Sequence, residues 1–178
     1  MKRILRFFEQ LFVERVLFAD LDGTIIVTRS GKIFSVDCED WQFKPHIIEA
    51  LKAYRPTAMH IISNQGGIEK GFVNIEDFNR KAIEICRQLG EELGINVTYD
   101  YCTSTDPTHP DRKNPRMIDS YCTDALHGTD CSKRNCLMIG DASGKAGQFS
   151  DSDRKCAENA NVAYMDVDDF IEKYSPQA

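Results

Sequence analysis

Five short apolar runs alternate with segments of helical periodicity along this chain of 178 residues, and this alternation limits the possible folds most strongly. The runs cover residues 16–19, 59–62, 97–101, 136–139 and 162–165. Strands that alternate with helices form parallel sheets in which helices cover both faces. The pattern therefore predicts an α/β fold, namely a doubly wound parallel sheet flanked by helices.

The helical segments carry recognisable start and stop residues. Apolar residues recur at three- and four-residue steps from 75 to 93, Asn74 is a typical N-cap, and Gly94 is a typical helix stop. A second helix is predicted for residues 45–54, with proline in its first turn. Residues 28–41 follow the first strand, so we expect a loop or small hairpin over the end of that strand.

Length and composition indicate one domain. With 178 residues, of which 42% are hydrophobic, the chain can bury a core of ordinary size. We expect a single domain over residues 16–175, preceded by an amphipathic helix over residues 1–15. The net charge of -6 provides no general attraction for nucleic acid, so any such contact must be local.

The cysteines bear on the cellular compartment. Seven cysteines form an odd set without a C-x-x-C pair, which fits neither a disulfide framework nor a zinc site of usual spacing. Reduced thiols in a cytoplasmic protein are the simpler interpretation. No apolar run approaches the length of a membrane span, so we expect no membrane partner.

The first apolar run ends in the sequence Asp20-Leu21-Asp22-Gly23-Thr24. Side chains alternate along an extended chain, so Asp20 and Asp22 point the same way. Gly23 permits a turn, and Thr24 offers a hydroxyl. Two carboxylates this close repel one another unless a cation or a proton lies between them, and Mg²⁺ prefers carboxylate and carbonyl oxygens. A plain Asp-Gly turn is the alternative interpretation.

Further polar groups stand at or after later strands. Ser63 follows the second apolar run and leads into two glycines, an arrangement suited to binding phosphate oxygens. Asp141 follows the fourth run and is placed to complete a Mg²⁺ shell with Asp20. Lys113, in a loop that contains prolines, would add a positive charge. Parallel strands bring their carboxyl ends to one crevice, where these groups would meet.

Two other features have ordinary structural interpretations. Asp151 and Asp153 precede a helical pattern, and we favour capping of that helix by one of them over metal ligation. Trp41 is able to stack on a nucleobase, but packing as a core aromatic beside Phe34 and Phe43 is favoured.

At these residues the chain resembles the haloacid dehalogenase (HAD) superfamily of phosphotransferases. The D-x-D-G-T sequence that starts at Asp20, the strand-terminal Ser63, the lysine at Lys113 and the Gly-Asp pair that ends at Asp141 follow the order of the family's motifs. The resemblance implies a HAD-like, Rossmann-like sheet. No stretch between the motifs is long enough for a large cap domain.

The resemblance also implies a role for each matching residue. Asp20 would attack phosphorus and form an aspartyl-phosphate, and Asp22 would protonate the leaving oxygen and then activate water. Ser63 and Lys113 would hold the phosphoryl group. Mg²⁺ would be bound by Asp20, the backbone carbonyl of Asp22, and Asp141.

A narrower resemblance concerns the 3′-phosphatase domain of polynucleotide kinase/phosphatases. It is carried by residues 28–32 after the first motif, by residues 64–71 with their N-Q-x-G-I sequence, and by residues 140–154 of the closing motif. The chain departs from that family at Lys70, where arginine usually follows G-I-G, and at Asn114, which interrupts the usual R-K-P sequence. No P-loop of a kinase domain occurs in this sequence.

We therefore predict a Mg²⁺-dependent phosphomonoesterase that acts on 3′-phosphorylated DNA or RNA ends, a polynucleotide 3′-phosphatase. The predicted substrate-binding residues are Thr24, Asn64, Arg29 and Lys70, of which the two basic ones give local attraction for phosphates. A small-molecule phosphatase of the histidinol-phosphate or heptose-bisphosphate type is the alternative within the enzyme class. A non-catalytic, HAD-like interaction module is the alternative outside it.

Overall fold

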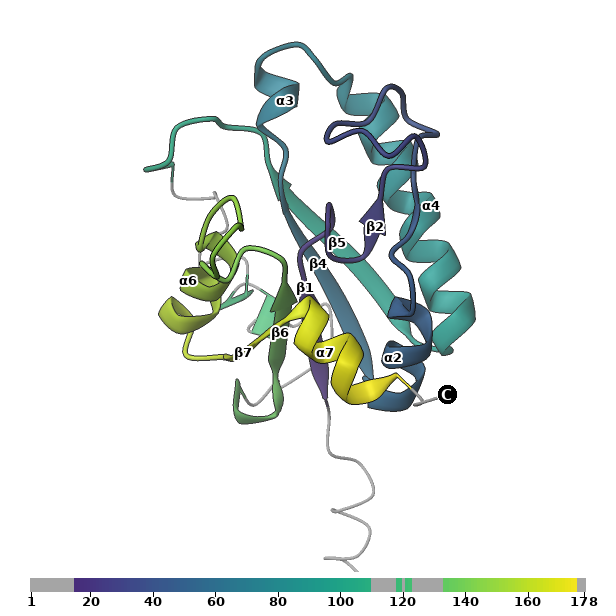
Figure 1. The fold of residues 1–178 in the computed structure, drawn as a ribbon, viewed down its shortest axis with the longest axis vertical. Coiled ribbons are helices and arrows are strands. Elements are labelled where there is room, and N and C mark those ends of the chain that lie inside the picture. The colour runs from purple at the N-terminus through teal and green to yellow at the C-terminus, as the bar shows by residue number, and fades with distance from the viewer. Residues whose placement is uncertain (1–14, 110–117, 120, 123–132, 176–178) are drawn as a thin grey trace, which may run out of the picture.

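The computed structural model describes residues 15–109, 118–119, 121–122 and 133–175. Its centre is a five-stranded sheet with the strand order β5-β4-β1-β6-β7, in which all neighbouring strands are parallel (Figure 1). The strands are β1 (Val16–Ala19), β4 (Ala58–Asn64), β5 (Asn96–Cys102), β6 (Leu137–Gly140) and β7 (Ala163–Asp166). The predicted parallel α/β sheet is confirmed.

Strand β1 lies in the middle of the sheet, and its four residues are all buried. Leu17 and Ala19 face one apolar cluster, while Val16 and Phe18 face another on the opposite side of the sheet. A strand buried on both faces has to be apolar throughout, which explains the uninterrupted run in the sequence.

Helices cover both faces of the sheet. The helices are α2 (Ile47–Tyr54), α3 (Gly66–Glu69), α4 (Ile75–Leu93), α6 (Ser152–Asn159) and α7 (Val167–Tyr174). Apolar residues of α2, α4 and α7 pack in the cluster around Leu17 on one face of the sheet. The cluster around Phe18, on the other face, contains apolar residues of α6 together with Ile118, Tyr121 and Cys122. This two-sided arrangement is the predicted doubly wound architecture.

The two predicted helices are present. Helix α4 has the predicted bounds: the Asn74 side chain accepts hydrogen bonds from the backbone N–H groups of residues 76 and 77, and Gly94 ends the helix in the left-handed conformation. Helix α2 starts at Ile47 rather than at residue 45. The reason is that His46 has a φ of 64°, a left-handed conformation that an α-helix does not continue.

The segment after β1 forms a small hairpin, as predicted. Strands β2 (Ile26–Val27) and β3 (Gln42–Phe43) pair in an antiparallel manner at the base of residues 28–41. The Asp40 carboxylate organises this loop by accepting hydrogen bonds from the backbone N–H and the hydroxyl of Ser30, both at 2.7 Å. The hydrogen bond from the Ser30 hydroxyl is the largest cause that holds the pKa of Asp40 below its usual value. No cap domain is formed by the described residues.

Two further predictions can be compared with the structure. Trp41 packs edge to face against Phe43, with ring centroids 5.6 Å apart, but Phe34 is 83% exposed, so its predicted packing beside Trp41 is wrong. The predicted N-terminal helix lies outside the described residues, apart from Arg15. Among described residues no helix is both long and apolar enough to cross a bilayer. No disulfide joins the described cysteines to one another.

Candidate active site

The three central strands each deliver a polar side chain to the same edge of the sheet. Asp20 directly follows β1, Ser63 lies near the end of β4, and Asp141 directly follows β6. These strands are neighbours in the order β4-β1-β6, so the groups converge as the sequence predicted. Asp20 and Ser63 are almost fully buried, with exposed fractions of 3% and 2%.

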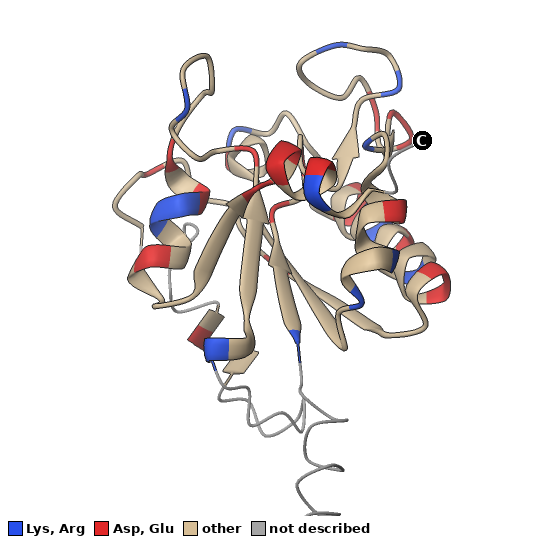
Figure 2. Ribbon diagram, turned by 60° about the horizontal axis from the view of Figure 1, so that its bottom comes forward, with Lys and Arg blue, Asp and Glu red and all other residues tan. Residues whose placement is uncertain are grey.

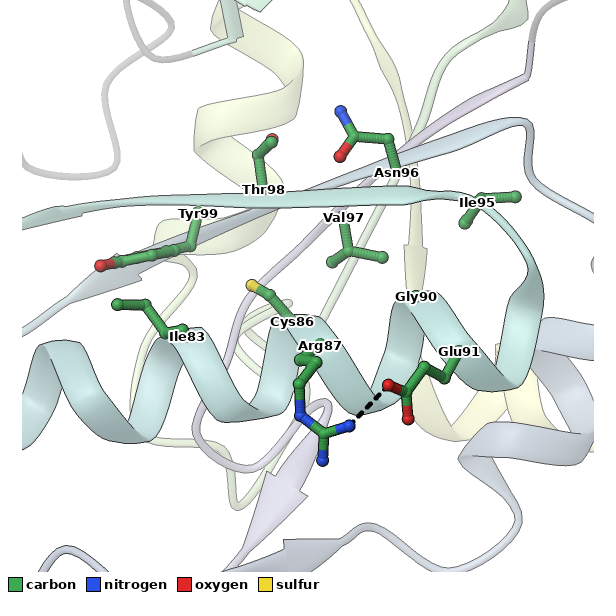
Figure 3. Close-up of a pocket in the computed structure, with 10 residues that line it drawn as sticks. All are labelled: Ile83, Cys86, Arg87, Gly90, Glu91, Ile95, Asn96, Val97, Thr98 and Tyr99. Carbon is green, nitrogen blue, oxygen red and sulfur yellow. Dashed lines mark hydrogen bonds and ion pairs between the residues drawn. The ribbon is translucent and has the colours of Figure 1, made fainter.

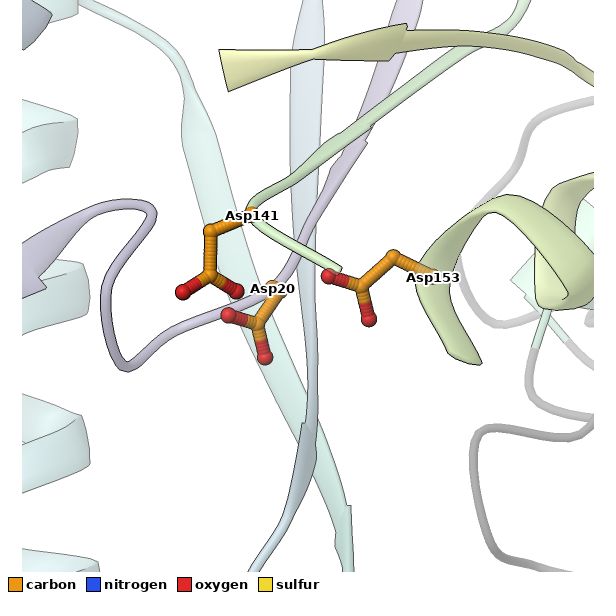
Figure 4. A group of neighbouring side chains, drawn as sticks. All are labelled: Asp20, Asp141 and Asp153. Atoms are coloured by element: carbon orange, nitrogen blue, oxygen red, sulfur yellow. The ribbon is translucent and has the colours of Figure 1, made fainter. Parts of the chain in front are cut away.

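Three carboxylates form a cluster at this edge. One oxygen from each of Asp20, Asp141 and Asp153 lies within 4.8 Å of the other two, and the three side chains point toward one another (Figure 4). Like charges at this separation require a compensating cation or proton. A set of carboxylate oxygens alone suits a hard cation such as Mg²⁺, so these residues fit the ion that the sequence predicted.

Asp153 belongs to the carboxylate cluster, whereas the sequence prediction favoured helix capping by either Asp151 or Asp153 over metal ligation. Asp151 occupies the N-cap position of α6, as expected for one of the two residues, but its side chain makes no capping hydrogen bond, and Asp153 reaches the carboxylate cluster from the first turn. Asp153 is completely buried, and its Oδ2 accepts a hydrogen bond of 3.0 Å from the backbone N–H of Ala142. This bond fixes the carboxylate against the loop that carries Asp141.

Gly140 makes room for Asp153. A Cβ atom at Gly140 would lie 2.2 Å from Oδ2 and 2.6 Å from Cγ of Asp153, closer than non-bonded atoms approach. We expect Gly140→Ala to displace the carboxylate, to lower the free energy of unfolding by roughly 1–3 kcal/mol, and to weaken binding of Mg²⁺. Thermal unfolding with and without Mg²⁺ measures both effects. This packing would be contradicted if the variant had the melting temperature of the wild type without Mg²⁺ and the same increase in melting temperature when Mg²⁺ is added.

Gly23 makes room for Asp141 in the same way as Gly140 does for Asp153. Its φ of 85° lies in the left-handed region, and a Cβ atom there would be 2.1 Å from Oδ2 of Asp141. The turn at Gly23 thus brings the backbone of the first motif against Asp141. Thr24, predicted to bind substrate, is fully buried, and its hydroxyl donates a hydrogen bond of 3.0 Å to Oδ2 of Asp20. Thr24 therefore orients the Asp20 carboxylate from the buried interior of the protein.

Asp22 stands apart from the cluster of three carboxylates. Its side chain is 53% exposed, and its Oδ2 accepts a hydrogen bond of 2.7 Å from Nε2 of Gln65. The same Gln65 nitrogen donates to the Ser63 hydroxyl at 2.8 Å. Gln65 is a site residue that the sequence prediction missed, although it stands in the N-Q-x-G-I sequence. It links the predicted acid and base to the predicted phosphate-binding hydroxyl.

Three further predicted substrate-binding residues are described in the structure: Asn64, Arg29 and Lys70. The side-chain oxygen of Asn64 is buried and has no hydrogen-bond partner among the described residues. Arg29 is exposed and donates to the backbone carbonyl of Trp41 at 3.1 Å. Lys70 is exposed at the end of α3. Lys113 lies outside the described residues.

The site carries strong negative charge. Asp and Glu residues gather where the strands end, as Figure 2 shows in red. The hydroxyl of Tyr164 donates to the carbonyl of Gly140 at 2.9 Å, next to the cluster. Burial raises the pKa of Tyr164 well above its usual value, and the neighbouring carboxylates raise it further: Asp153, Asp166, Asp141 and Asp20. Such a field attracts a divalent cation.

A separate groove lies along the edge of the sheet, between α4 and β5 (Figure 3). Its volume is about 710 Å³, and its wall includes Cys86, Gly90 and Val97. None of the predicted site residues lines it. The carboxylate cluster at the strand ends, not this groove, is therefore the candidate active site.

Comparison with solved structures agrees with the observed fold. The D,D-heptose 1,7-bisphosphate phosphatase of B. bronchiseptica, solved with magnesium and phosphate, superposes with a TM-score of 0.64 at 19% sequence identity. The match covers 84% of this chain and 78% of that one. At this level of identity the likeness establishes the fold alone.

Comparison of sequences gives closer relatives. The bifunctional polynucleotide phosphatase/kinase of Schizosaccharomyces pombe is 30% identical over 155 residues, which are 85% of this chain but 36% of that protein. The chain thus spans about a third of the length of that relative. A D-glycero-β-D-manno-heptose-1,7-bisphosphate 7-phosphatase of Helicobacter pylori is 32% identical over 85 residues, or 47% of each chain.

The fold therefore falls in the class of parallel α/β sheets to which the solved phosphatase belongs. Within that class, a family model described as polynucleotide kinase 3 phosphatase matches residues 15–171. The chain belongs to this family.

Proposed function

We propose that the chain is a Mg²⁺-dependent phosphomonoesterase that works through an aspartyl-phosphate, and that its substrate is a 3′-phosphorylated DNA or RNA end. The observation that carries the proposal is the cluster of Asp20, Asp141 and Asp153 at one edge of the sheet, together with Gln65, which links Asp22 to Ser63. This arrangement combines a buried carboxylate, a second carboxylate that is partly exposed, and a buried hydroxyl that Gln65 links to the second carboxylate.

In the first step, a carboxylate oxygen of Asp20 attacks phosphorus, and the bond between phosphorus and the leaving oxygen breaks. Asp22, as the acid, gives its proton to that oxygen, so an alcohol leaves. Thr24 keeps the attacking carboxylate in place through its hydrogen bond to Oδ2. Ser63 would hold an oxygen of the phosphoryl group.

In the second step, Asp22 takes a proton from water, and the water oxygen attacks phosphorus. The bond between phosphorus and Asp20 breaks, which releases inorganic phosphate and restores the carboxylate. Asp20, Asp141 and Asp153 are the residues that would hold Mg²⁺, with the backbone carbonyl of Asp22 as a further ligand. When bound, Mg²⁺ offsets the negative charge of the phosphoryl oxygens, so that an anionic nucleophile can approach the phosphorus atom.

The family match supports a polynucleotide end as the substrate, because the family model matches residues 15–171, which include almost all of the described residues. Exposed basic residues would give local attraction for a phosphate backbone despite the net charge of -6: Arg29, Lys32 and Lys70. No described segment closes over the crevice as a cap domain, which leaves space for a large ester.

A sugar bisphosphate is the second candidate substrate. It is favoured by the partial match to the Helicobacter pylori phosphatase and by the fold shared with the B. bronchiseptica enzyme. The sequence match covers less than half of this chain, which is why the polynucleotide end is preferred.

Release of phosphate from a panel of substrates tests the proposal. The panel contains a 3′-phosphorylated oligonucleotide, the same oligonucleotide with a 5′-phosphate, heptose 1,7-bisphosphate and histidinol phosphate, each with Mg²⁺ or with EDTA. We expect the 3′-phosphate to be hydrolysed fastest and EDTA to remove the activity. Faster hydrolysis of a metabolite would reject the polynucleotide substrate but keep the phosphatase, and no release from any substrate would reject both.

A further inference from the structure

Lys81 is a lysine on the buried face of α4. It lies three residues after Phe78 and four before Ile85, both of which are buried in the core. Only 9% of the Lys81 side-chain surface is exposed. Lysine side chains usually keep their charged end in water, and burying that charge is costly unless a partner compensates it.

The charged end of Lys81 faces the candidate active site. Its Nζ lies 3.8 Å from Oδ1 of Asp22, and 5.7 Å from the centroid of the Phe78 ring. Within the described ranges, Asp22 is the one carboxylate that Lys81 reaches as an ion pair. The lysine that α4 buries is thus paired with the predicted acid and base of the reaction.

Asp22 is held from two sides as a result. Oδ2 accepts a hydrogen bond from Gln65, at the junction of β4 and α3, while Oδ1 faces Lys81 on α4. About half of the Asp22 side chain is exposed, and without these two contacts it would rotate freely. One hydrogen bond and one ion pair from different elements favour a single orientation of the carboxylate.

We propose that Lys81 is a positioning residue for Asp22. This inference rests on the proposed function, because it requires Asp22 to move protons in the reaction. A group that transfers a proton has to be held within hydrogen-bond reach of the reacting oxygen, and small misplacements slow the reaction. Packing alone does not need the charge: removing one partner of an ion pair is costly when the other stays buried and charged, and Asp22, with a side chain that is 53% exposed, would not be left buried.

Steady-state kinetics of Lys81→Met test the proposal with two substrates, the 3′-phosphorylated oligonucleotide and p-nitrophenyl phosphate. For the oligonucleotide we expect kcat to fall roughly tenfold with little change in KM, because Asp22 is then poorly placed to give its proton to the leaving alkoxide oxygen. For p-nitrophenyl phosphate we expect kcat/KM to fall less than about twofold, because its leaving group departs without a proton.

Three comparisons separate positioning from a structural role. Lys81→Arg keeps the charge and is expected to recover most of the kcat. Lys52→Met removes a surface lysine that pairs with Glu92 on the far end of α4, and is expected to match the wild type. The melting temperature of Lys81→Met is expected to stay at or above that of the wild type.

The inference is overturned if kcat of Lys81→Met equals that of the wild type, or if KM alone rises, which would make Lys81 a substrate contact. It is also overturned if both substrates lose activity equally while the melting temperature falls. If the wild-type protein releases no phosphate from either substrate, the proposed function fails and this inference fails with it. A fully active Lys81→Met variant would leave the proposed function intact.

Discussion

Asp20→Asn is expected to lower the turnover of every phosphate monoester by at least about 10⁴-fold. A carboxamide is a very weak nucleophile, and the substitution also removes one negative charge from the three-carboxylate cluster. The change preserves size and shape, and an asparagine oxygen can still accept the hydrogen bond from Thr24. The variant should therefore fold normally, which circular dichroism checks.

Two measurements make this test specific to the nucleophile. Acid-quenched wild-type enzyme should carry one additional phosphate by mass spectrometry, whereas Asp20→Asn should carry none. Asp151→Asn is the matched control, because Asp151 is an acid at the start of the same helix as Asp153 and pairs with Lys155 outside the cluster. Retained turnover in Asp20→Asn would show that another group attacks phosphorus.

Much of the fold could be predicted because the strands are short, apolar and bounded by polar residues. In β1 both faces are buried, so its sequence has no alternation to misread. The candidate site followed from the same logic: Asp20 and Asp141 stand directly after strands, and parallel strands bring such residues together.

Asp153 shows why the rest could not be predicted as directly. Acidic residues are common in the first turn of a helix, where they interact with its positive end, so capping was the simpler hypothesis. The sequence does contain a signal against it. Asp153 shares one helix face with Cys156, Ala157 and Ala160, all of which are buried. A carboxylate on an apolar face indicates a buried partner, and the same argument applies to Lys81 in α4.

The contacts of Asp22 depend on tertiary structure alone. Gln65 lies 43 positions along the chain from Asp22, and neither periodicity nor composition connects them. Thr24 likewise could have faced substrate or protein, and the turn at Gly23 decides that it faces Asp20. The sequence names the chemical groups of such a site, whereas the packed loops decide which atoms meet.

Asp22→Asn is expected to lower turnover of the 3′-phosphorylated oligonucleotide by at least about 100-fold while substrate binding is retained. An asparagine can still accept the hydrogen bond from Gln65, but it neither donates a proton to a leaving oxygen nor takes one from water. Steady-state kinetics measure the loss of turnover, and binding of the oligonucleotide is measured by fluorescence anisotropy. Asp37→Asn, in the exposed part of the 28–41 loop, is the matched control and should behave as the wild type.

The Asp22→Asn substitution is expected to affect the rates of the two proposed steps differently when the substrate has a better leaving group. With p-nitrophenyl phosphate the first step needs no acid, so the Asp22→Asn enzyme should still become phosphorylated. The second step lacks its base, so we expect a burst of one p-nitrophenolate per enzyme followed by slow release of phosphate. Equal, wild-type rates in both phases would reject the acid and base role of Asp22, and with it the reason for holding this carboxylate between Gln65 and Lys81.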